Sequence, residues 1–210
     1  LRGAIEMFED HGSRMTREQR QKFLTNMDGD VDHLHRLTNS LQDLAKADMQ
    51  EPQMNASTNL TELLKTLRQR FNNQHPTYEL TLELPAEDVF AATSTEAIEA
   101  ALTQIIENAL VHGQTTSSIT LKLNSQNSRA IIEVADDGVG ISEGNRAKVL
   151  QPFFTTAKDK GGTGLGLAIA SRLIESQRGS LSLLPGALPN EKGARFRIEL
   201  RQTSRPVELA

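Results

Sequence analysis

The sequence predicts an α+β protein in which an N-terminal helical hairpin is followed by a two-layer α/β sandwich. The first fifty residues show a heptad spacing of apolar side chains and almost no strand pattern. From about Thr58 onward, helical stretches are interspersed with short segments in which apolar and polar residues alternate strictly. Such alternation indicates strands with one buried face and one wet face, whereas a doubly wound parallel sheet would show continuous apolar runs.

The composition is that of an ordinary globular protein and excludes several functions. The 210 residues carry 23 Lys and Arg against 27 Asp and Glu, and the net charge of −4 argues against a nucleic-acid-binding domain. Without cysteine, a disulfide scaffold, a thiolate metal site and a cysteine nucleophile are excluded. No apolar run is long enough to span a membrane. Because the sequence starts at Leu1 within a helical pattern, we expect a fragment with further segments upstream.

The hairpin is predicted over residues 1–52. Residues 1–11 have the pattern of a helix that ends at Gly12, and a second helix is predicted from Thr16 to the region of Asp48–Pro52. The second helix carries a heptad stripe, which Leu37 and Leu44 widen: Leu24, Met27, Val31, Leu34 and Leu41. A hairpin cannot bury so wide a stripe alone, so residues 1–50 are expected to pair with a second copy into a dimeric four-helix bundle.

The sandwich is predicted over residues 53–204. Its helices are expected at 58–71, 94–112 and 164–177, and its strands at 79–84, 118–123, 129–135 and 195–200. Because each strand has one apolar face, the three helices should lie together on one side of the sheet.

The first motif with chemical meaning is Asp136-Asp137-Gly138-Val139-Gly140, directly after the strand at 129–135. Asp136 shares the phase of the buried residues of that strand, so its carboxylate should face the helix layer and needs a hydrogen-bond donor there. The exocyclic amine of adenine would be one. The glycines allow a tight turn and a close approach to a ligand, although an Asp-Gly turn that merely ends a strand is also common.

A second motif, Gly161 to Leu167 (GGTGLGL), runs into a predicted helix. Backbone N–H groups at such a glycine-rich helix start bind phosphate well. The motif is neither a Rossmann fingerprint, because no strand directly precedes it, nor a P-loop, because no Gly-Lys-Ser/Thr follows.

The helix at 94–112 supplies a third feature, since Gln104, Asn108 and His112 stand four residues apart on one flank of its apolar stripe. Such a row can present two amide oxygens and an imidazole to a metal–phosphate group. Glu107 lies opposite the stripe, which argues against its being a catalytic base. Residues 141–161, between the two glycine motifs, form a long polar loop of the kind that often acts as a lid, with Phe153 and Phe154 as possible anchors.

Taken in order, these features closely resemble the ATP-binding domain of sensor histidine kinases, in the gyrase/Hsp90/histidine kinase/MutL superfamily with its Bergerat-type ATP-binding fold. ENALVH resembles the N box, DDGVG the first glycine box, QPFF the F box and GTGLGL the second glycine box. The resemblance implies that the domain binds ATP and Mg²⁺. It also implies that Asn108 and Gln104 hold the metal, that Asp136 reads adenine, and that His112 and Lys158 lie near the phosphates. The remaining residues expected at the nucleotide follow from the same motifs: Gly138, Gly140, Ile141, Phe153, Gly162, Thr163, Gly164, Leu165, Gly166 and Leu167.

The first fifty residues resemble the dimerisation hairpin of the same family, and LRGAIEMF is similar to the stretch that follows the phosphoacceptor box. On this basis the acceptor histidine lies upstream of Leu1. His11, His33 and His35 lack the acidic residue and the Thr/Asn-Pro that follow an acceptor. The resemblance implies an ATP-dependent protein-histidine kinase that passes phosphate to an aspartate of a response regulator receiver domain. It implies a cytoplasmic fragment of a protein that is held in the bacterial inner membrane by upstream segments.

Position 104 departs from the family, because the kinases usually carry Asn there and the ATP-hydrolysing members of the superfamily carry a Glu that activates water. Gln cannot accept that proton, which counts against a chaperone, topoisomerase or mismatch-repair ATPase. Two alternatives stay open. One is a serine kinase of the anti-sigma type, which would lack the hairpin, and the other is a non-catalytic dimeric scaffold with a degenerate nucleotide site.

Overall fold

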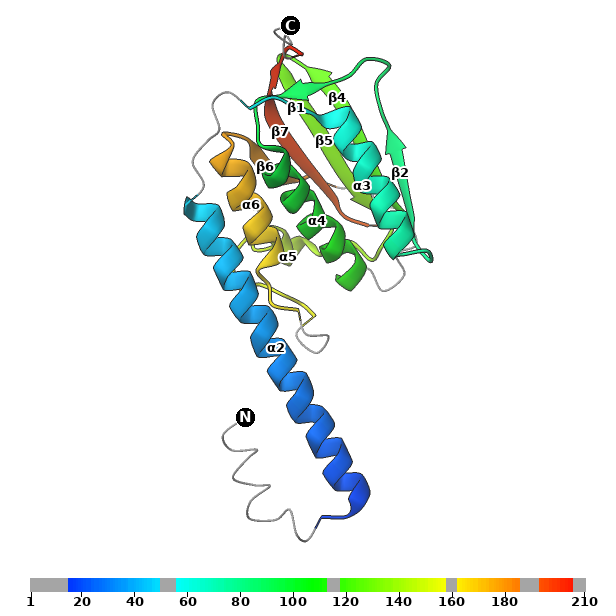
Figure 1. The fold of residues 1–210 in the computed structure, drawn as a ribbon, viewed down its shortest axis with the longest axis vertical. Helices are drawn as coiled ribbons and strands as arrows, with labels where there is room; N and C mark the ends of the chain where they lie inside the picture. The colour runs from blue at the N-terminus through cyan, green and yellow to red at the C-terminus, as the bar shows by residue number, and fades with distance from the viewer. Residues whose placement is uncertain (1–14, 50–55, 113–117, 158–161, 186–192, 206–210) are drawn as a thin grey trace, which may run out of the picture.

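A long helix, α2 (Arg17–Met49), precedes a sandwich of one sheet and three helices (Figure 1). The computed structural model describes residues 15–49, 56–112, 118–157, 162–185 and 193–205. The first predicted hairpin helix lies outside this range, so the hairpin itself and the domain boundary at residue 52 stay predictions. None of the helices described has both the length and the apolar content that a bilayer crossing requires.

Helix α2 begins as its sequence predicts. The Thr16 backbone N–H donates to the Gln19 side-chain oxygen at 2.9 Å, and the Gln19 N–H donates to the Thr16 hydroxyl at 3.2 Å. This reciprocal pair is a capping box, which satisfies two N–H groups at the helix start. The helix ends at Met49, close to the predicted end.

Within the described residues the sheet has seven strands, in the order β1-β3-β7-β5-β4-β2, with β6 pairing with β7 outside this path. Its members are β1 (Thr58–Asn59), β2 (Glu79–Glu83), β3 (Phe90–Ala91), β4 (Ser118–Gln126), β5 (Arg129–Asp136), β6 (Ser180–Leu183) and β7 (Arg195–Thr203). All pairs are antiparallel except β2–β4, which is parallel. The four predicted strands are confirmed, while β1, β3 and β6 are too short for alternation to predict.

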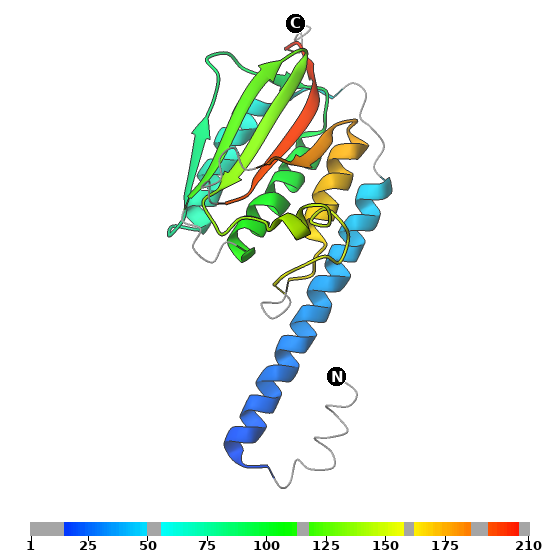
Figure 2. The same cartoon turned by 180° about the vertical axis from the view of Figure 1, so that it is seen from behind.

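The three larger helices of the sandwich lie together on one face of the sheet, as predicted (Figures 1 and 2). They are α3 (Leu60–Gln74), α4 (Thr95–His112) and α6 (Gly166–Ser176), and a short helix, α5 (Glu143–Arg146), interrupts the loop after β5. The buried core between the layers contains the predicted apolar residues of β4, β5, β7 and α4. The other sheet face carries cross-strand ion pairs, such as Arg197 with Glu133 at 2.7 Å and Lys122 with Glu83 at 2.8 Å.

Helix α2 has two separate apolar stripes, which the sequence pattern merged into one. Leu37 and Leu44 pack against the core of the sandwich, and Ala47 is buried there. The heptad residues remain 38–47% exposed: Leu24, Val31, Leu34 and Leu41. At 100° per residue the two stripes are centred about 120° apart around the helix. Figure 2 shows α2 running alongside α6, where Asp48 pairs with Arg172 at 3.5 Å.

Candidate nucleotide-binding site

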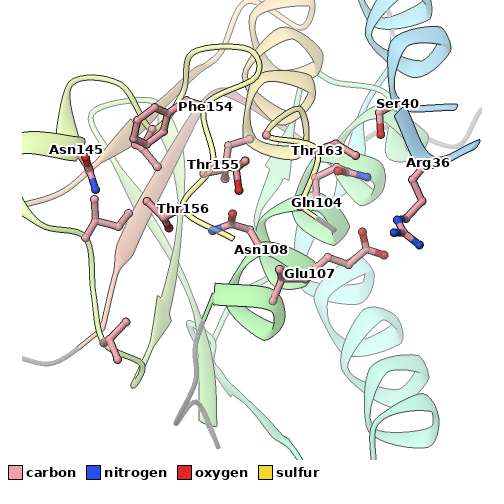
Figure 3. A pocket seen from close by; sticks show the side chains of 18 of the residues that line it. Arg36, Ser40, Gln104, Glu107, Asn108, Asn145, Phe154, Thr155, Thr156 and Thr163 are labelled. Atoms are coloured by element: carbon pink, nitrogen blue, oxygen red, sulfur yellow. The ribbon is translucent and has the colours of Figure 1, made fainter. Parts of the chain in front are cut away.

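A cavity of about 510 Å³ opens between α2, α4, the loop after β5 and the glycine-rich start of α6. Figure 3 shows polar side chains from three of these elements directed into it. The cavity therefore lies at the end of the sandwich where the conspicuous sequence motifs converge.

Helix α4 contributes two amides to the cavity. Gln104 and Asn108 lie one helical turn apart, because side chains four residues apart share a helix face. The opposite face of α4 is held in the core by residues such as Ile105, which is 1% exposed. The amide of Asn108 is directed toward Thr155 and Thr156, and that of Gln104 toward Thr163 (Figure 3).

The glycine-rich segment approaches both α4 and the loop so closely that side chains would not fit. Gly164 has a φ of +68°, and a Cβ there would lie 2.6 Å from the carbonyl carbon of Phe153. A Cβ on Gly166 would lie 2.8 Å from the Gln104 side-chain oxygen. These glycines bring backbone N–H groups to the cavity wall.

Helix α6 begins at this wall without a side-chain cap. The side chain of its N-cap residue, Leu165, makes no capping hydrogen bond, and the side chains in the first turn include no acidic group. The Leu165 N–H itself donates to the Thr163 hydroxyl at 3.3 Å. The first N–H groups of a helix have no partner within the helix, and together with the helix dipole they favour an anion. This end of α6 can therefore bind a phosphate group.

Asp136 lies beside this cavity rather than in its wall. Its Oδ1 accepts hydrogen bonds from the backbone N–H groups of Gly138 at 2.9 Å and Ala194 at 3.2 Å. Burial raises the pKa of Asp136 above its ordinary value, and these two N–H groups only partly oppose that effect. The carboxyl borders an adjacent cavity of about 310 Å³, and the segment Val139–Ile141 lines both cavities.

The loop between the glycine motifs closes onto the start of α6. The Gly162 N–H donates to the Ala157 carbonyl at 3.0 Å, and the Ala157 N–H donates to the Thr155 hydroxyl at 3.0 Å. Phe153 has a φ of +66° and is 59% exposed, whereas Phe154 lines the cavity. Phe153, with its left-handed backbone, is thus turned to solvent and does not line this cavity, and its predicted contact with a ligand stays a prediction.

Nine of the predicted site residues line the main cavity together: Gln104, Asn108, Gly140, Ile141, Gly162, Thr163, Gly164, Gly166 and Leu167. Leu165 does not, because its side chain is fully buried in the core. Gly138 does not line the cavity either, but its N–H donates a hydrogen bond to the carboxylate of Asp136. Lys158 and the side chain of His112 lie outside the described residues, so their predicted roles stay predictions.

Sequence reasoning missed the contribution of α2, which lines the cavity with Arg36, Asn39, Ser40 and Asp43. Glu107 was not expected to act as a catalytic base, because it lies opposite the apolar stripe of α4. Glu107 is indeed exposed, yet it lines the cavity because α2 lies on that side of α4. Although the side chain as a whole is exposed, partial desolvation of its carboxyl at the cavity raises the pKa of Glu107. For the α2 residues, the only available signal in the sequence was that they are polar and lie on the side of the helix away from the heptad stripe.

The oxygen donors of the cavity fit a hard cation that is coordinated partly by the protein and partly by phosphate oxygens. The described residues contain no cluster of three or more His, Cys, Asp or Glu side chains that could hold a metal ion. Gln104 and Asn108 instead offer amide oxygens beside the phosphate-binding end of α6. Mg²⁺ usually keeps several waters and takes only one or two protein oxygens when it is bound with phosphates, so the two amide oxygens could serve as its protein ligands.

Comparison with known proteins gives the family of the chain. Residues 93–204 match the family described as histidine kinase-, DNA gyrase B-, and HSP90-like ATPase. The alginate biosynthesis sensor protein KinB of Pseudomonas aeruginosa is 31% identical over 145 residues, which are 67% of this chain and 24% of KinB. The chain thus spans about a quarter of the length of that relative.

Solved structures resemble the fold over nearly the whole chain. Histidine kinase ThkA in complex with response regulator protein TrrA has a TM-score of 0.68 at 20% identity, covering 96% of this chain and 58% of that one. Full-length ShkA in complex with AMPPNP has a TM-score of 0.67 at 22% identity, covering 95% and 42%. The chain therefore belongs to the histidine kinase-, DNA gyrase B- and HSP90-like ATPase family. Within it, the chain carries the catalytic ATPase domain of a sensor histidine kinase of the two-component type.

Proposed function

We propose that this chain binds Mg-ATP in the main cavity and transfers the γ-phosphate to a histidine upstream of Leu1, from which it passes to an aspartate of a response regulator. The observation that carries the proposal is the convergence of Gln104 and Asn108 with the uncapped, glycine-rich start of α6 at one cavity. ShkA, which shares the fold, was crystallised with an ATP analogue.

Asp136 is the proposed adenine-binding residue. One carboxylate oxygen already accepts two backbone N–H groups, which leaves the other oxygen to accept from an exocyclic amine. Because Val139–Ile141 separates Asp136 from the main cavity, a shift of this segment would let one nucleotide reach both. Such a shift is within the ordinary range of binding loops that follow a strand.

In the proposed reaction the phosphate chain lies along the glycine-rich segment Gly162–Leu167, where the N–H groups of Gly164, Gly166 and Leu167 face it, and the amides of Asn108 and Gln104 would hold Mg²⁺. Bound Mg²⁺ would neutralise part of the charge that develops on the transferred phosphate. Transfer to a histidine needs chiefly positioning and charge stabilisation, and no carboxylate has to activate water. An uncharged Gln104 suits this role, and His112 and Lys158 remain proposed phosphate neighbours.

The proposal extends to the partners of the full protein. The exposed heptad stripe of α2 fits pairing with a second copy, as expected for residues 1–50. ThkA was crystallised with its response regulator, which supports a receiver domain as the second partner. We also propose that upstream segments anchor the full-length protein in the bacterial inner membrane and leave this part in the cytoplasm. Of the alternatives, a serine kinase of the anti-sigma type is disfavoured by α2. A non-catalytic scaffold is disfavoured by Asn108, Asp136 and the glycine segment, although Gln104 departs from the family pattern.

The proposal is tested by mixing this chain with an N-terminally extended version in which Asn108 is replaced by alanine. The mixture is incubated with Mg²⁺ and ATP labelled at the γ-phosphate, and an extended chain with intact Asn108 is tested in parallel. Acid-labile, alkali-stable label on either extended chain supports the kinase, and the comparison distinguishes transfer between subunits from transfer within one. Absence of label on both, with ATP bound in a separate titration, overturns the kinase in favour of the scaffold.

A further inference from the structure

Helix α2 takes part in the wall of the nucleotide cavity through side chains that the family motifs do not include. It is fixed there by Leu37 and Leu44, which pack on the core, and by the pair of Asp48 with Arg172. Arg36 and Asp43 lie on the edge of this docked face and line the cavity. A charged edge of the hairpin helix is therefore held directly at the proposed nucleotide site.

The charges around the cavity make Arg36 distinctive. Among the described residues that line it, Arg36 is the one cationic side chain, and Asp43 and Glu107 are the acidic ones. Without Arg36 the formal charge of this lining would be −2, which opposes the approach of a polyphosphate. Neutral amides, hydroxyls and backbone N–H groups supply the remaining polar contacts. Among the described lining residues, Arg36 is thus the side chain best suited to attract the anionic end of a nucleotide.

Glu107 is the group that Arg36 faces in the present structure. Figure 3 shows the guanidinium of Arg36 and the carboxylate of Glu107 directed toward one another across the cavity mouth. The two side chains come from different elements, α2 and α4, and no hydrogen bond or ion pair within the described residues holds the Arg36 guanidinium. A guanidinium that no hydrogen bond or ion pair holds can turn to an anion in the cavity without first breaking such a contact.

We propose that Arg36 is a phosphate-binding residue supplied by the hairpin helix, and that its guanidinium turns from Glu107 to the phosphate chain when nucleotide occupies the cavity. This rests on the proposed function, because it presumes that the cavity takes ATP. A guanidinium can bind two phosphate oxygens at once, so the contact adds both charge and direction. Bound nucleotide would then hold α2 against the catalytic domain, and Glu107 would compete with the phosphates for Arg36.

The test is a set of titrations with ATP and with adenosine, each in the presence of Mg²⁺, on the wild type and on Arg36→Gln, Arg36→Lys and Glu107→Gln. Arg36→Gln should weaken ATP binding about tenfold and leave adenosine binding within about twofold, because adenosine has no phosphate. Arg36→Lys should recover part of the loss, and Glu107→Gln should strengthen ATP binding. The matched control is Arg17→Gln, an exposed change about 28 Å along the same helix at 1.5 Å per residue, which should leave ATP affinity unchanged.

Three results would overturn the inference. Equal losses for ATP and adenosine in Arg36→Gln would mean that the residue only holds α2 in place. Similar weakening by Arg36→Gln and Glu107→Gln would mean that the two side chains form a structural tether. An unchanged ATP affinity in Arg36→Gln would remove any contact with phosphate. In all three cases the wild type still binds ATP, so the proposed function is unaffected. A wild type that binds no ATP would instead contradict the proposed function.

Discussion

Replacement of Asp136 by asparagine isolates the proposed adenine contact from the structural role of the same side chain. In the wild type, Oδ1 accepts from the Gly138 N–H at 2.9 Å and from the Ala194 N–H at 3.2 Å. An asparagine oxygen can accept both bonds. Its NH₂ group, however, replaces the oxygen that remains for the ligand and cannot accept from the adenine amine.

The expected loss follows from the hydrogen bond that is removed. A hydrogen bond to a charged group contributes about 1.5–3 kcal/mol, which corresponds to about a 10- to 150-fold weaker affinity for ATP. Folding should suffer little, because the two backbone N–H groups keep their acceptor and burial already disfavours the charged form of Asp136. We expect the Tm to fall by no more than about 4 °C. Calorimetric titration with Mg-ATP and a thermal melt measure the two quantities.

The pH dependence of binding provides a second readout. Because burial raises the pKa of Asp136, its carboxylate takes up a proton at a higher pH than the ordinary value of about 3.9. ATP affinity should therefore fall as the pH decreases toward this raised pKa, and Asp136→Asn should lack that change. Folding has the opposite sign: the contribution of Asp136 to stability decreases as the pH rises from the ordinary to the raised pKa.

The control is Asp137→Asn, because Asp137 is exposed and its carboxylate accepts from the Ser118 N–H at 3.2 Å. This neighbouring change removes the same charge and should leave ATP affinity within about twofold, since a surface charge has only a small effect. Unchanged ATP affinity in Asp136→Asn, or equal losses in both variants, would refute the assignment of Asp136 to adenine.

Three further predictions concern the glycine segment, the core and the heptad stripe. Gly164→Ala should lower the Tm and the ATP affinity, with a loss of about 1–3 kcal/mol in stability, because φ is +68° and the new Cβ would lie 2.6 Å from the carbonyl carbon of Phe153. The control is Gly144→Ala, where a Cβ would meet nothing within 4 Å and neither quantity should change. Gln177→Ala should destabilise the fold by about 1–3 kcal/mol in denaturant unfolding, because the buried Ser94 N–H loses its acceptor at 3.0 Å. Leu34→Asp, at a side chain that is 47% exposed, should shift analytical ultracentrifugation toward monomer without lowering ATP affinity, and an unchanged dimer would contradict the predicted bundle.

The fold was largely predictable because period and phase are local properties of the chain. Ile119 and Ile132 are fully buried, as alternation predicts, and the start of α2 at Thr16 follows from its capping residues. The parallel pairing of β2 with β4 could not be predicted, since its register depends on how α4 folds back over the sheet. Strands as short as β1, Thr58–Asn59, carry no periodicity at all.

The site residues that lie within a continuous sequence motif could be predicted. Gln104 and Asn108 line one cavity with the glycine segment, as the family resemblance implied, and their spacing placed them on one face of α4. Arg36 could not be predicted, because it reaches the cavity only through the packing of α2 against α6. The positive φ that directs Phe153 to solvent is likewise set by contacts between loop and glycine segment rather than by the local sequence.

Whether this cavity is a Mg-ATP site can be decided by titrating the wild type and Asn108→Ala with ATP, each with and without Mg²⁺. We expect saturable binding of one ATP per chain in the wild type, strengthened by Mg²⁺. We also expect this strengthening to disappear when the Asn108 amide is removed. A wild type that does not bind ATP, or an effect of Mg²⁺ that survives in Asn108→Ala, would contradict the assignment of a Mg-ATP site to this cavity.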